Sequence, residues 1–188
     1  IVWNIGFLNT YTDKEKDILG KFSSNLFTLN TFYTANKSIV GRSQSIDCES
    51  FLQNYWDLVV KNMKQWQEVQ NREITKVDLR ENFIATQSIV IQALGRVGNY
   101  FYSNKVEMEA YLKKLEKINW SRNAKQWYMR AVGKNGRIIT NKKAAMLIAN
   151  VIKKEIGIPL TQEEKNSEEF LKKTKEEIVG QEDVSVLV

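Results

Sequence analysis

The stretch FIATQSIVIQALGRVGNYF, residues 83–101, decides the fold of this chain. Apolar residues recur in it at helical spacing and also fill positions in between, so more than one side of the helix is apolar. A helix with so wide an apolar face belongs at the centre of a core. Because Thr75-x-x-Asp78 is a suitable N-terminal cap, we expect this central helix to span about residues 76–103.

Apolar residues at helical spacing predict further helices on both sides of the central one. We expect them at about residues 12–40, 48–70, 105–118, 120–128, 140–156 and 161–178. Capping boxes at Thr12–Glu15 and Thr161–Glu164 mark the starts of the first and the last. The polar segment 41–47 is expected to be a loop. Asn135-Gly136 lies between two apolar pairs and predicts a tight turn, at most a small β-hairpin near 131–139.

The composition favours a single, mainly α-helical domain. The chain has 188 residues, of which 43% are hydrophobic, with one proline and nine glycines. So few helix-breaking residues favour long helices, and the length suits one core. We therefore expect a compact multi-helix bundle around the central helix, forming one domain over 1–178 with a frayed C-terminal tail over 179–188.

Several kinds of chemistry are excluded by residue types that are missing. The chain has no histidine, which excludes Ser-His-Asp catalysis and His-ligated metals, and one cysteine cannot form a thiolate cluster. No phosphate-binding loop motif occurs. We therefore expect no catalytic residue, no metal and no cofactor here. An enzyme that acts on DNA or a nucleotide through Asp, Glu or Lys alone stays an alternative that no spacing supports, and the activity of a longer parent protein is left open. The lone Cys48 fits a reducing, cytoplasmic location, and no apolar run approaches the ~20 residues of a membrane span.

Charge is distributed unevenly along the chain. The net charge is +6, yet residues 111–160 hold 12 basic and 2 acidic residues, a balance of +10. Residues 161–188 hold 4 basic and 8 acidic residues, a balance of −4. Such segregation favours a polyanionic partner for 111–160, with a solvated helix face as the alternative.

Within this basic stretch, the spacing predicts two basic surfaces. Lys113 and Lys117 are four residues apart and should share one helical face. Lys143, Asn150 and Lys154 should share a face of the next helix. Arginines between them suit phosphates, because the guanidinium group donates two parallel hydrogen bonds. The candidate nucleic-acid-binding residues are Lys113, Lys117, Arg122, Lys125, Arg130, Arg137, Lys142, Lys143 and Lys154.

Two tryptophans, Trp120 and Trp127, interleave with these cations and are candidates for stacking on bases. Core packing is the favoured interpretation for both, since large aromatic side chains usually lie inside. A helix-turn-helix is not favoured, because the connection from Tyr128 to the following helix is too long for that motif.

Two glycines and two arginines of the central segment could have either structural or phosphate-binding roles. Gly95 and Gly98 lie in an apolar helical run, which favours close helix packing over a phosphate-cradling loop. For Arg80 and Arg96 we prefer structural roles, an interhelical salt bridge or a cap on backbone carbonyl groups.

Several strings also occur in the order typical of a known family. They are Leu26-Phe27-Thr28-Leu29 with Tyr33-x-Ala35, Tyr55-Trp56 with Trp66, Leu79-Arg80, Gln92-Ala93-Leu94-Gly95-Arg96-Val97-Gly98-Asn99, Ile118-Asn119-Trp120-Ser121-Arg122-Asn123, Gly136-Arg137 and Leu160-Thr161-x-Glu163-Glu164. Over about residues 20–170 the chain thereby resembles the C-terminal region of the DndB family, the DNA sulfur modification-associated proteins of bacteria.

The resemblance implies a place in phosphorothioate DNA modification, in which sulfur replaces a non-bridging oxygen of the backbone. It implies an accessory or regulatory member that binds DNA. The Asp-Gly-Gln-His-Arg motif of this DGQHR-domain type belongs to the N-terminal half of the family and is absent here, so activity of that half is not implied. The start at Ile1 agrees with a fragment of a longer protein.

Two functions follow as expectations. The first is an accessory DNA-associated domain that binds DNA without catalysis through the basic surface in 111–160. The alternative is a protein-interaction or dimerisation module of the same system, without direct DNA contact. Its partners would be other sulfur-modification proteins, its own N-terminal half, or a second copy that offers the acidic segment 161–188.

Overall fold

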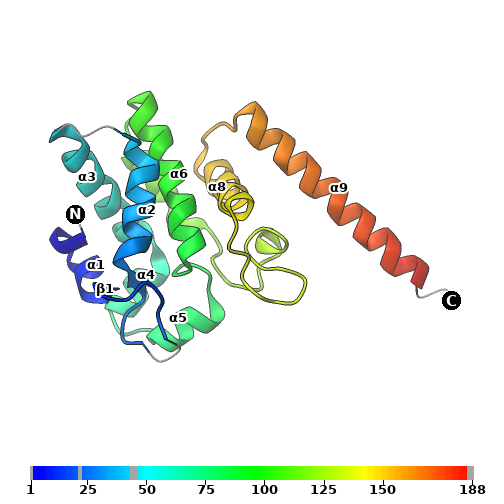
Figure 1. Cartoon of the computed structure of the whole chain (residues 1–188), viewed down its shortest axis with the longest axis horizontal. Coiled ribbons are helices and arrows are strands. Elements are labelled where there is room, and N and C mark those ends of the chain that lie inside the picture. Colours follow the sequence, from blue (N-terminus) through cyan, green and yellow to red (C-terminus); the bar gives the residue numbers. More distant parts are fainter. Residues whose placement is uncertain (1, 21–22, 43–45, 186–188) are drawn as a thin grey trace.

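A computed structural model describes residues 2–20, 23–42 and 46–185 of the chain, which are mainly α-helical (Figure 1). The helices are α1 (Gly6–Tyr11), α2 (Leu29–Val40), α3 (Ile46–Asn62), α4 (Lys64–Gln70), α5 (Lys76–Asn82), α6 (Ser88–Asn104), α7 (Glu109–Leu112), α8 (Lys142–Ile156) and α9 (Gln162–Ser185). The shorter elements are the 3-10 helices η1 (Val2–Asn4), η2 (Lys113–Lys117) and η3 (Lys125–Trp127), and the parallel strands β1 (Thr12–Asp13) and β2 (Phe27–Thr28). The expected fold class is confirmed.

Helix α6 lies at the centre of the bundle, between α2 on one side and α8 on the other (Figure 1). Its side chains are buried around most of its circumference, as the broad apolar face predicts. The buried apolar side chains are Ile89, Val90, Ile91, Ala93, Leu94, Val97 and Phe101. From α3, the Tyr55 hydroxyl donates a hydrogen bond of 2.6 Å to the Leu94 carbonyl oxygen. The stretch 83–101 therefore supplies the core on which the other helices pack.

Two glycines allow α2 and α6 to approach closely. A Cβ atom on Gly95 would lie 2.9 Å from the backbone oxygen of Ala35 and 3.0 Å from its Cα. A Cβ atom on Gly98 would lie 2.9 Å from Cγ1 of Ile39. The expectation of close helix packing at both glycines is confirmed.

The expected single helix over 76–103 is wrong, because it is interrupted between α5 and α6. The capping box of Thr75 and Asp78 does begin α5, but Phe83 is extended and forms an antiparallel bridge with Ser121. The Ile84 amide also donates 3.0 Å to the Trp120 carbonyl oxygen. Backbone pairing with a distant segment thus replaces a turn of helix, which local periodicity does not reveal.

The expected helix over 12–40 is also shorter than predicted. Thr12 begins β1, and the Asp13 side chain accepts hydrogen bonds from the amides of Glu15 and Lys16, which makes a turn. The helix α2 begins only after Thr28, whose hydroxyl accepts from the Thr31 amide.

The expected helices over 48–70, 105–118 and 120–128 are broken or largely absent. The first is divided at Met63, which is extended. The second contains only α7 and η2, and the third only η3. In the last two segments 3-10 helix replaces much of the expected α-helix.

The C-terminal part follows the sequence more closely. Asn141 caps α8 through a 2.8 Å bond from the Ala144 amide, and Gly157 ends it at φ +88°. Thr161 and Glu164 form the expected capping box of α9. A tight turn with a Val132–Ile138 bridge confirms the hairpin signal.

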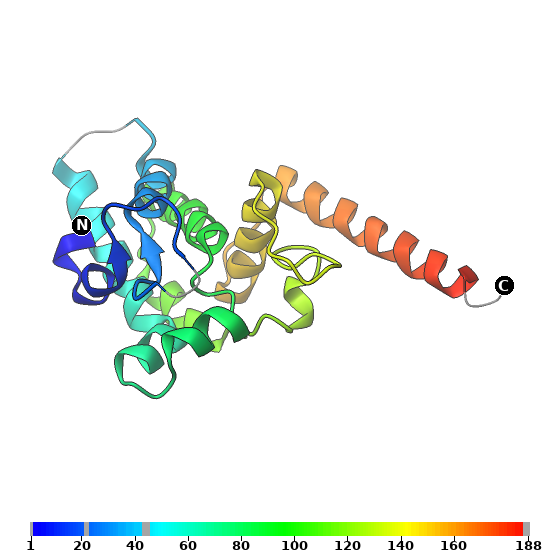
Figure 2. The same cartoon turned by 60° about the horizontal axis from the view of Figure 1, so that its bottom comes forward.

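The remaining segment expectations are met in part. Gly41 and Arg42 lie in a turn, residues 43–45 lie outside the described residues, and α3 starts at Ile46. Helix α9 continues past residue 178 to Ser185, and 186–188 lie outside the described residues. Figures 1 and 2 show that α9 leaves α8 and projects away from the bundle. No helix in the described ranges has the length and apolar character needed to span a bilayer.

We predict that Gly95→Ala destabilises the protein by about 1–3 kcal/mol, because the new methyl group meets backbone atoms of α2 that cannot move aside cheaply. The free energy of unfolding from urea denaturation measures this. Gly6→Ala is the control, since a Cβ atom on Gly6 has no neighbour within 4 Å. Equal stabilities of the two variants would contradict the role of the α2–α6 contact.

Candidate nucleic-acid interface

The segment 119–141, which we call the basic loop, connects η2 to α8. Two buried tryptophans anchor it. The rings of Trp120 and Trp127 stack with their centroids 5.4 Å apart and their planes at 14°, and both side chains are at most 1% exposed. Trp127 Nε1 donates 2.7 Å to the carbonyl oxygen of Asn119. Core packing is therefore confirmed for both tryptophans, and stacking on bases is wrong for these rings as they lie here.

Arg122 holds the basic loop together from within. One guanidinium nitrogen donates 2.7 Å to the carbonyl oxygen of Gly136, and the Arg122 amide donates 2.8 Å to the carbonyl oxygen of Asn82. The arginine thus joins the α5–α6 junction, the start of the loop and the turn near Gly136. Arg122, one of the candidate DNA-binding cations, therefore also stabilises the conformation of the basic loop.

A first group of cations projects from the basic loop and the start of α8. Lys125, Arg137 and Lys142 are exposed and form no ion pair with any described residue. Lys134, which was not among the candidates, is exposed in the same turn as Arg137. Lys143 differs from these four, because its Nζ lies 4.0 Å from the ring centroid of Phe170 in α9.

A second group, Lys113 and Lys117, lies on η2. The neighbouring Lys114 Nζ donates 3.0 Å to the carbonyl oxygen of Ile156, which places η2 at the far end of α8 from Lys142. Because α8 has 15 residues, the two ends are about 20 Å apart. Since η2 is a 3-10 helix with three residues per turn, Lys113 and Lys117 do not share a face, and that expectation is wrong.

A third group, Arg130, Lys153 and Lys154, lies beside α9 and is paired with its carboxylates. Glu168 Oε2 forms ion pairs with Arg130 Nη2 at 2.5 Å and with Lys154 Nζ at 3.2 Å. Glu164 accepts a 2.6 Å ion pair from Lys153, which is buried. The expectation that Arg130 and Lys154 present free charge is therefore wrong in this arrangement.

Asn150 also lies beside α9. It is fully buried, and its amide donates to Oε1 of Glu168 at 3.2 Å. In the expected row of Lys143, Asn150 and Lys154, only Asn150 is buried, while the two lysines are exposed and contact Phe170 and Glu168 of α9. Sequence reasoning missed Lys153 as a member. The signal that indicates this contact is the four-residue spacing of Glu164 and Glu168, which puts both carboxylates on one face of α9.

The pKa values of the two carboxyl groups reflect these pairs. Burial alone would raise the pKa of Glu168, but the hydrogen bond and charge of Arg130 hold that pKa below its usual value. Burial likewise opposes ionisation of Glu164, and the hydrogen bond from Lys153 again keeps its pKa low. Both groups are thus charged and anchor α9 at neutral pH.

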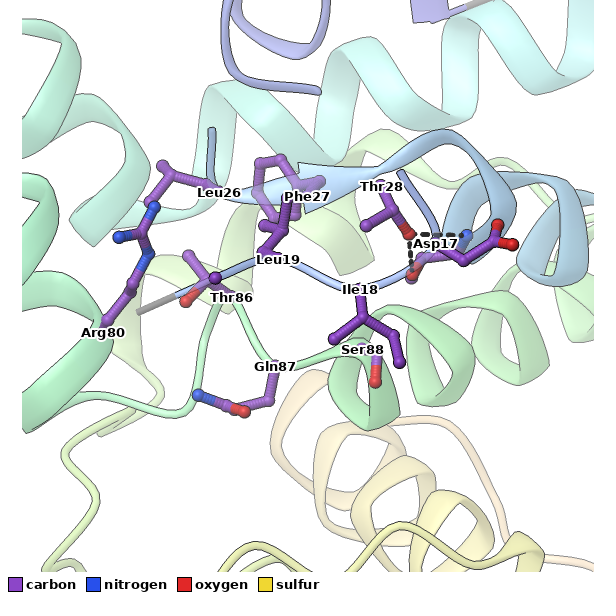
Figure 3. A pocket seen from close by; sticks show the side chains of 12 residues that line it. Asp17, Ile18, Leu19, Leu26, Phe27, Thr28, Arg80, Thr86, Gln87 and Ser88 are labelled. Atoms are coloured by element: carbon purple, nitrogen blue, oxygen red, sulfur yellow. Dashed lines mark hydrogen bonds between the residues drawn. The ribbon is translucent and has the colours of Figure 1, made fainter. Parts of the chain in front are cut away.

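A separate hollow of about 370 Å³ lies where α2 and α6 begin (Figure 3). Arg80 lies at one end of it and donates to the carbonyl oxygens of Ser23 and Asn25, and burial lowers its pKa. The carbonyl-cap interpretation of Arg80 is therefore confirmed. Arg96 forms no ion pair with a described residue, so the salt-bridge interpretation is wrong for it. In the described ranges no His, Cys, Asp and Glu side chains gather into a metal-binding group.

The geometry defines a helical domain with a basic loop held on a tryptophan anchor and a C-terminal acidic helix across part of it. The sequence profile of the DndB family, described as DNA-sulfur modification-associated, matches residues 1–159, and the chain belongs to this family. The match covers α1 to α8 and the basic loop and ends before α9. Neither a curated protein nor a solved structure matches the chain. The resemblance is confirmed for the family, and the assignment to its C-terminal region stays a prediction.

We predict that Glu168→Gln lowers the free energy of unfolding by about 1–2 kcal/mol at pH 7, through the loss of charge-assisted hydrogen bonds. The folded pKa of Glu168 lies below the usual 4.5, so its contribution is complete above pH 4.5 and is lost as the pH falls through the lowered value. The stability difference between wild type and variant should therefore shrink in acid.

Urea denaturation at a series of pH values measures this difference. Glu169→Gln is the control, because Glu169 is exposed and should follow the wild type throughout. A difference that stays constant down to pH 3 would show that Glu168 does not stabilise the fold through its charge.

Proposed function

We propose that this domain is an accessory component of a DNA sulfur modification system and binds duplex DNA, without catalysis, through the basic loop and the start of α8. The observation that supports this most directly is a set of basic residues that remain exposed after folding and form no ion pair with a described residue. Residues 117–154 contain ten basic and no acidic residues, and Lys125, Lys134, Arg137 and Lys142 are exposed. Membership of a DNA-sulfur modification-associated family supplies the context.

The expected contact is with the phosphate backbone. Lysine and arginine side chains bind phosphates and release condensed counterions, which makes the affinity depend on salt and very little on sequence. Because Trp120 and Trp127 are committed to each other in the core, they do not supply stacking platforms for single-stranded bases. Charge without these platforms favours duplex over single-stranded DNA.

A double variant, Lys125→Gln with Arg137→Gln, tests the proposal. Each phosphate contact contributes about 0.9 to the slope of log affinity against log salt, so the variant should bind more weakly and lose up to about 2 from that slope. Fluorescence anisotropy with a labelled duplex over a salt titration measures both quantities.

The control is Lys37→Gln with Lys61→Gln, which removes the same charge from exposed positions of α2 and α3. These helices lie beyond α6 from the basic loop (Figure 1). Equal losses in the two double variants would show that net charge, and not the basic loop, sets the affinity. No duplex binding, together with salt-sensitive self-association in size-exclusion chromatography, would favour the interaction module instead.

A further inference from the structure

We propose that α9 is a removable cover on a second phosphate-binding face, in which Glu164 and Glu168 occupy the positions that DNA phosphates take when the cover leaves. The covered face consists of Arg130, Asn150 and Lys153, with Lys154, whose side chain is 51% exposed, at its edge. This inference rests on the proposed DNA binding and extends it. Duplex DNA and the acidic helix compete for the same side chains.

The carboxylates meet the covered face much as phosphates would. Glu168 lies between two cations, with Oε2 bound to both Arg130 and Lys154, and its Oε1 accepts from the Asn150 amide. A carboxylate and a phosphate both present charged acceptor oxygens to the same donors. A ligand that replaces Glu168 therefore finds three donors already converging on one point.

Two cations of the covered face, Arg130 and Lys153, also have contacts that do not involve α9. Arg130 Nη1 donates 3.2 Å to the Gln126 carbonyl oxygen within the basic loop, and Lys153 Nζ lies 5.9 Å from the Tyr100 ring centroid of α6. Arg130 is itself a residue of the basic loop, so the covered face continues the exposed cations of that loop. Departure of α9 would therefore enlarge the basic surface of the loop and would not expose a separate basic surface elsewhere.

The contact of α9 is polar and incompletely satisfied. Arg130 Nε and Asn150 Oδ1 are buried there without a hydrogen-bond partner. Leu171 is the one buried apolar side chain in the part of α9 whose side chains are described, 162–178. Beside the start of the helix, a hollow of about 420 Å³ opens at Pro159 and Leu160. Ion pairs, and not a packed apolar seam, therefore hold the cover.

The arrangement of the chain also allows the cover to move as a unit. Gly157 ends α8 and Thr161 caps α9, so a short connection separates two independently capped helices. Figures 1 and 2 show α9 running outward from α8, with its far end away from the bundle. The family match, which ends at residue 159, contains every cation of the covered face and none of α9.

The first test compares Glu168→Gln with Glu169→Gln in duplex-binding titrations. Both remove one negative charge from the same helix, but only the first releases Arg130 and Lys154. We expect Glu168→Gln to bind about three- to tenfold more tightly than Glu169→Gln and to gain up to about 2 in the salt slope, from two new phosphate contacts. Equal affinities and equal salt slopes for the two variants would contradict the proposal that α9 covers a phosphate-binding face.

The second test needs no substitution. Amide hydrogen exchange of the wild-type chain, with and without saturating duplex, reports whether α9 leaves its seat. Exchange in residues 165–178 should accelerate on binding, and unchanged or slower exchange would overturn the inference.

The outcomes separate this inference from the proposed function. Suppose that duplex binding depends on Lys125 and Arg137, that Glu168→Gln and Glu169→Gln bind with equal affinity, and that exchange in α9 is unchanged. This result would contradict the role of α9 as a cover and would leave the proposed DNA binding supported. Absence of duplex binding in the wild type and in both glutamine variants overturns both.

Discussion

The close contact of α2 and α6 at Gly95 is the constraint on which the other layers of the molecule depend. With backbone atoms of Ala35 only 2.9–3.0 Å from where a Cβ atom would lie, no residue larger than glycine fits without moving a helix. This contact sets the position of α6, and α6 in turn has apolar surface left over for α8. The face of α6 that packs closely on α2 thus determines where the opposite face of α6 contacts α8 in the C-terminal half of the chain.

The C-terminal half uses its charges in three different ways, and only the structure separates them. The Arg122 guanidinium group donates a hydrogen bond to the Gly136 carbonyl oxygen within the basic loop. Arg130 is paired with Glu168 under α9. Lys125 is exposed to solvent. A balance of +10 over 111–160 therefore overstates the charge that a partner meets, because structural arginines and paired lysines count toward it equally.

Local signals predicted several helix starts, although the capping box expected at Thr12–Glu15 is wrong, because Thr12 begins a strand and Asp13 makes a turn. The caps at Thr75, Asn141 and Thr161 are side-chain hydrogen bonds to nearby amides, and all three occur as the sequence indicates. The breaks at 83–87 and Met63 could not be predicted in this way. At Ile84 the amide bonds to Trp120, more than thirty residues away, and helical periodicity contains no information about such a partner.

The same distinction explains the outcome for the candidate site. The residue types of the basic stretch indicated a polyanion surface, but their exposure depends on which face α9 covers. In the row of Lys143, Asn150 and Lys154, only Asn150 is buried, because α9 packs over it, and the two lysines stay exposed beside α9. Trp120 and Trp127 followed the general tendency of large aromatic side chains to lie inside.

The stacked tryptophans have a further consequence for the thermodynamics of association. The basic loop has little regular secondary structure, and an unanchored segment of that kind loses conformational entropy each time it binds. With Trp120 and Trp127 fixed in the core, that ordering takes place once, during folding. In the proposed binding of DNA, the lysines and arginines of the loop would meet the polyanion as a preorganised array, and we expect electrostatic steering of the encounter, more than loop rearrangement, to set the rate of association.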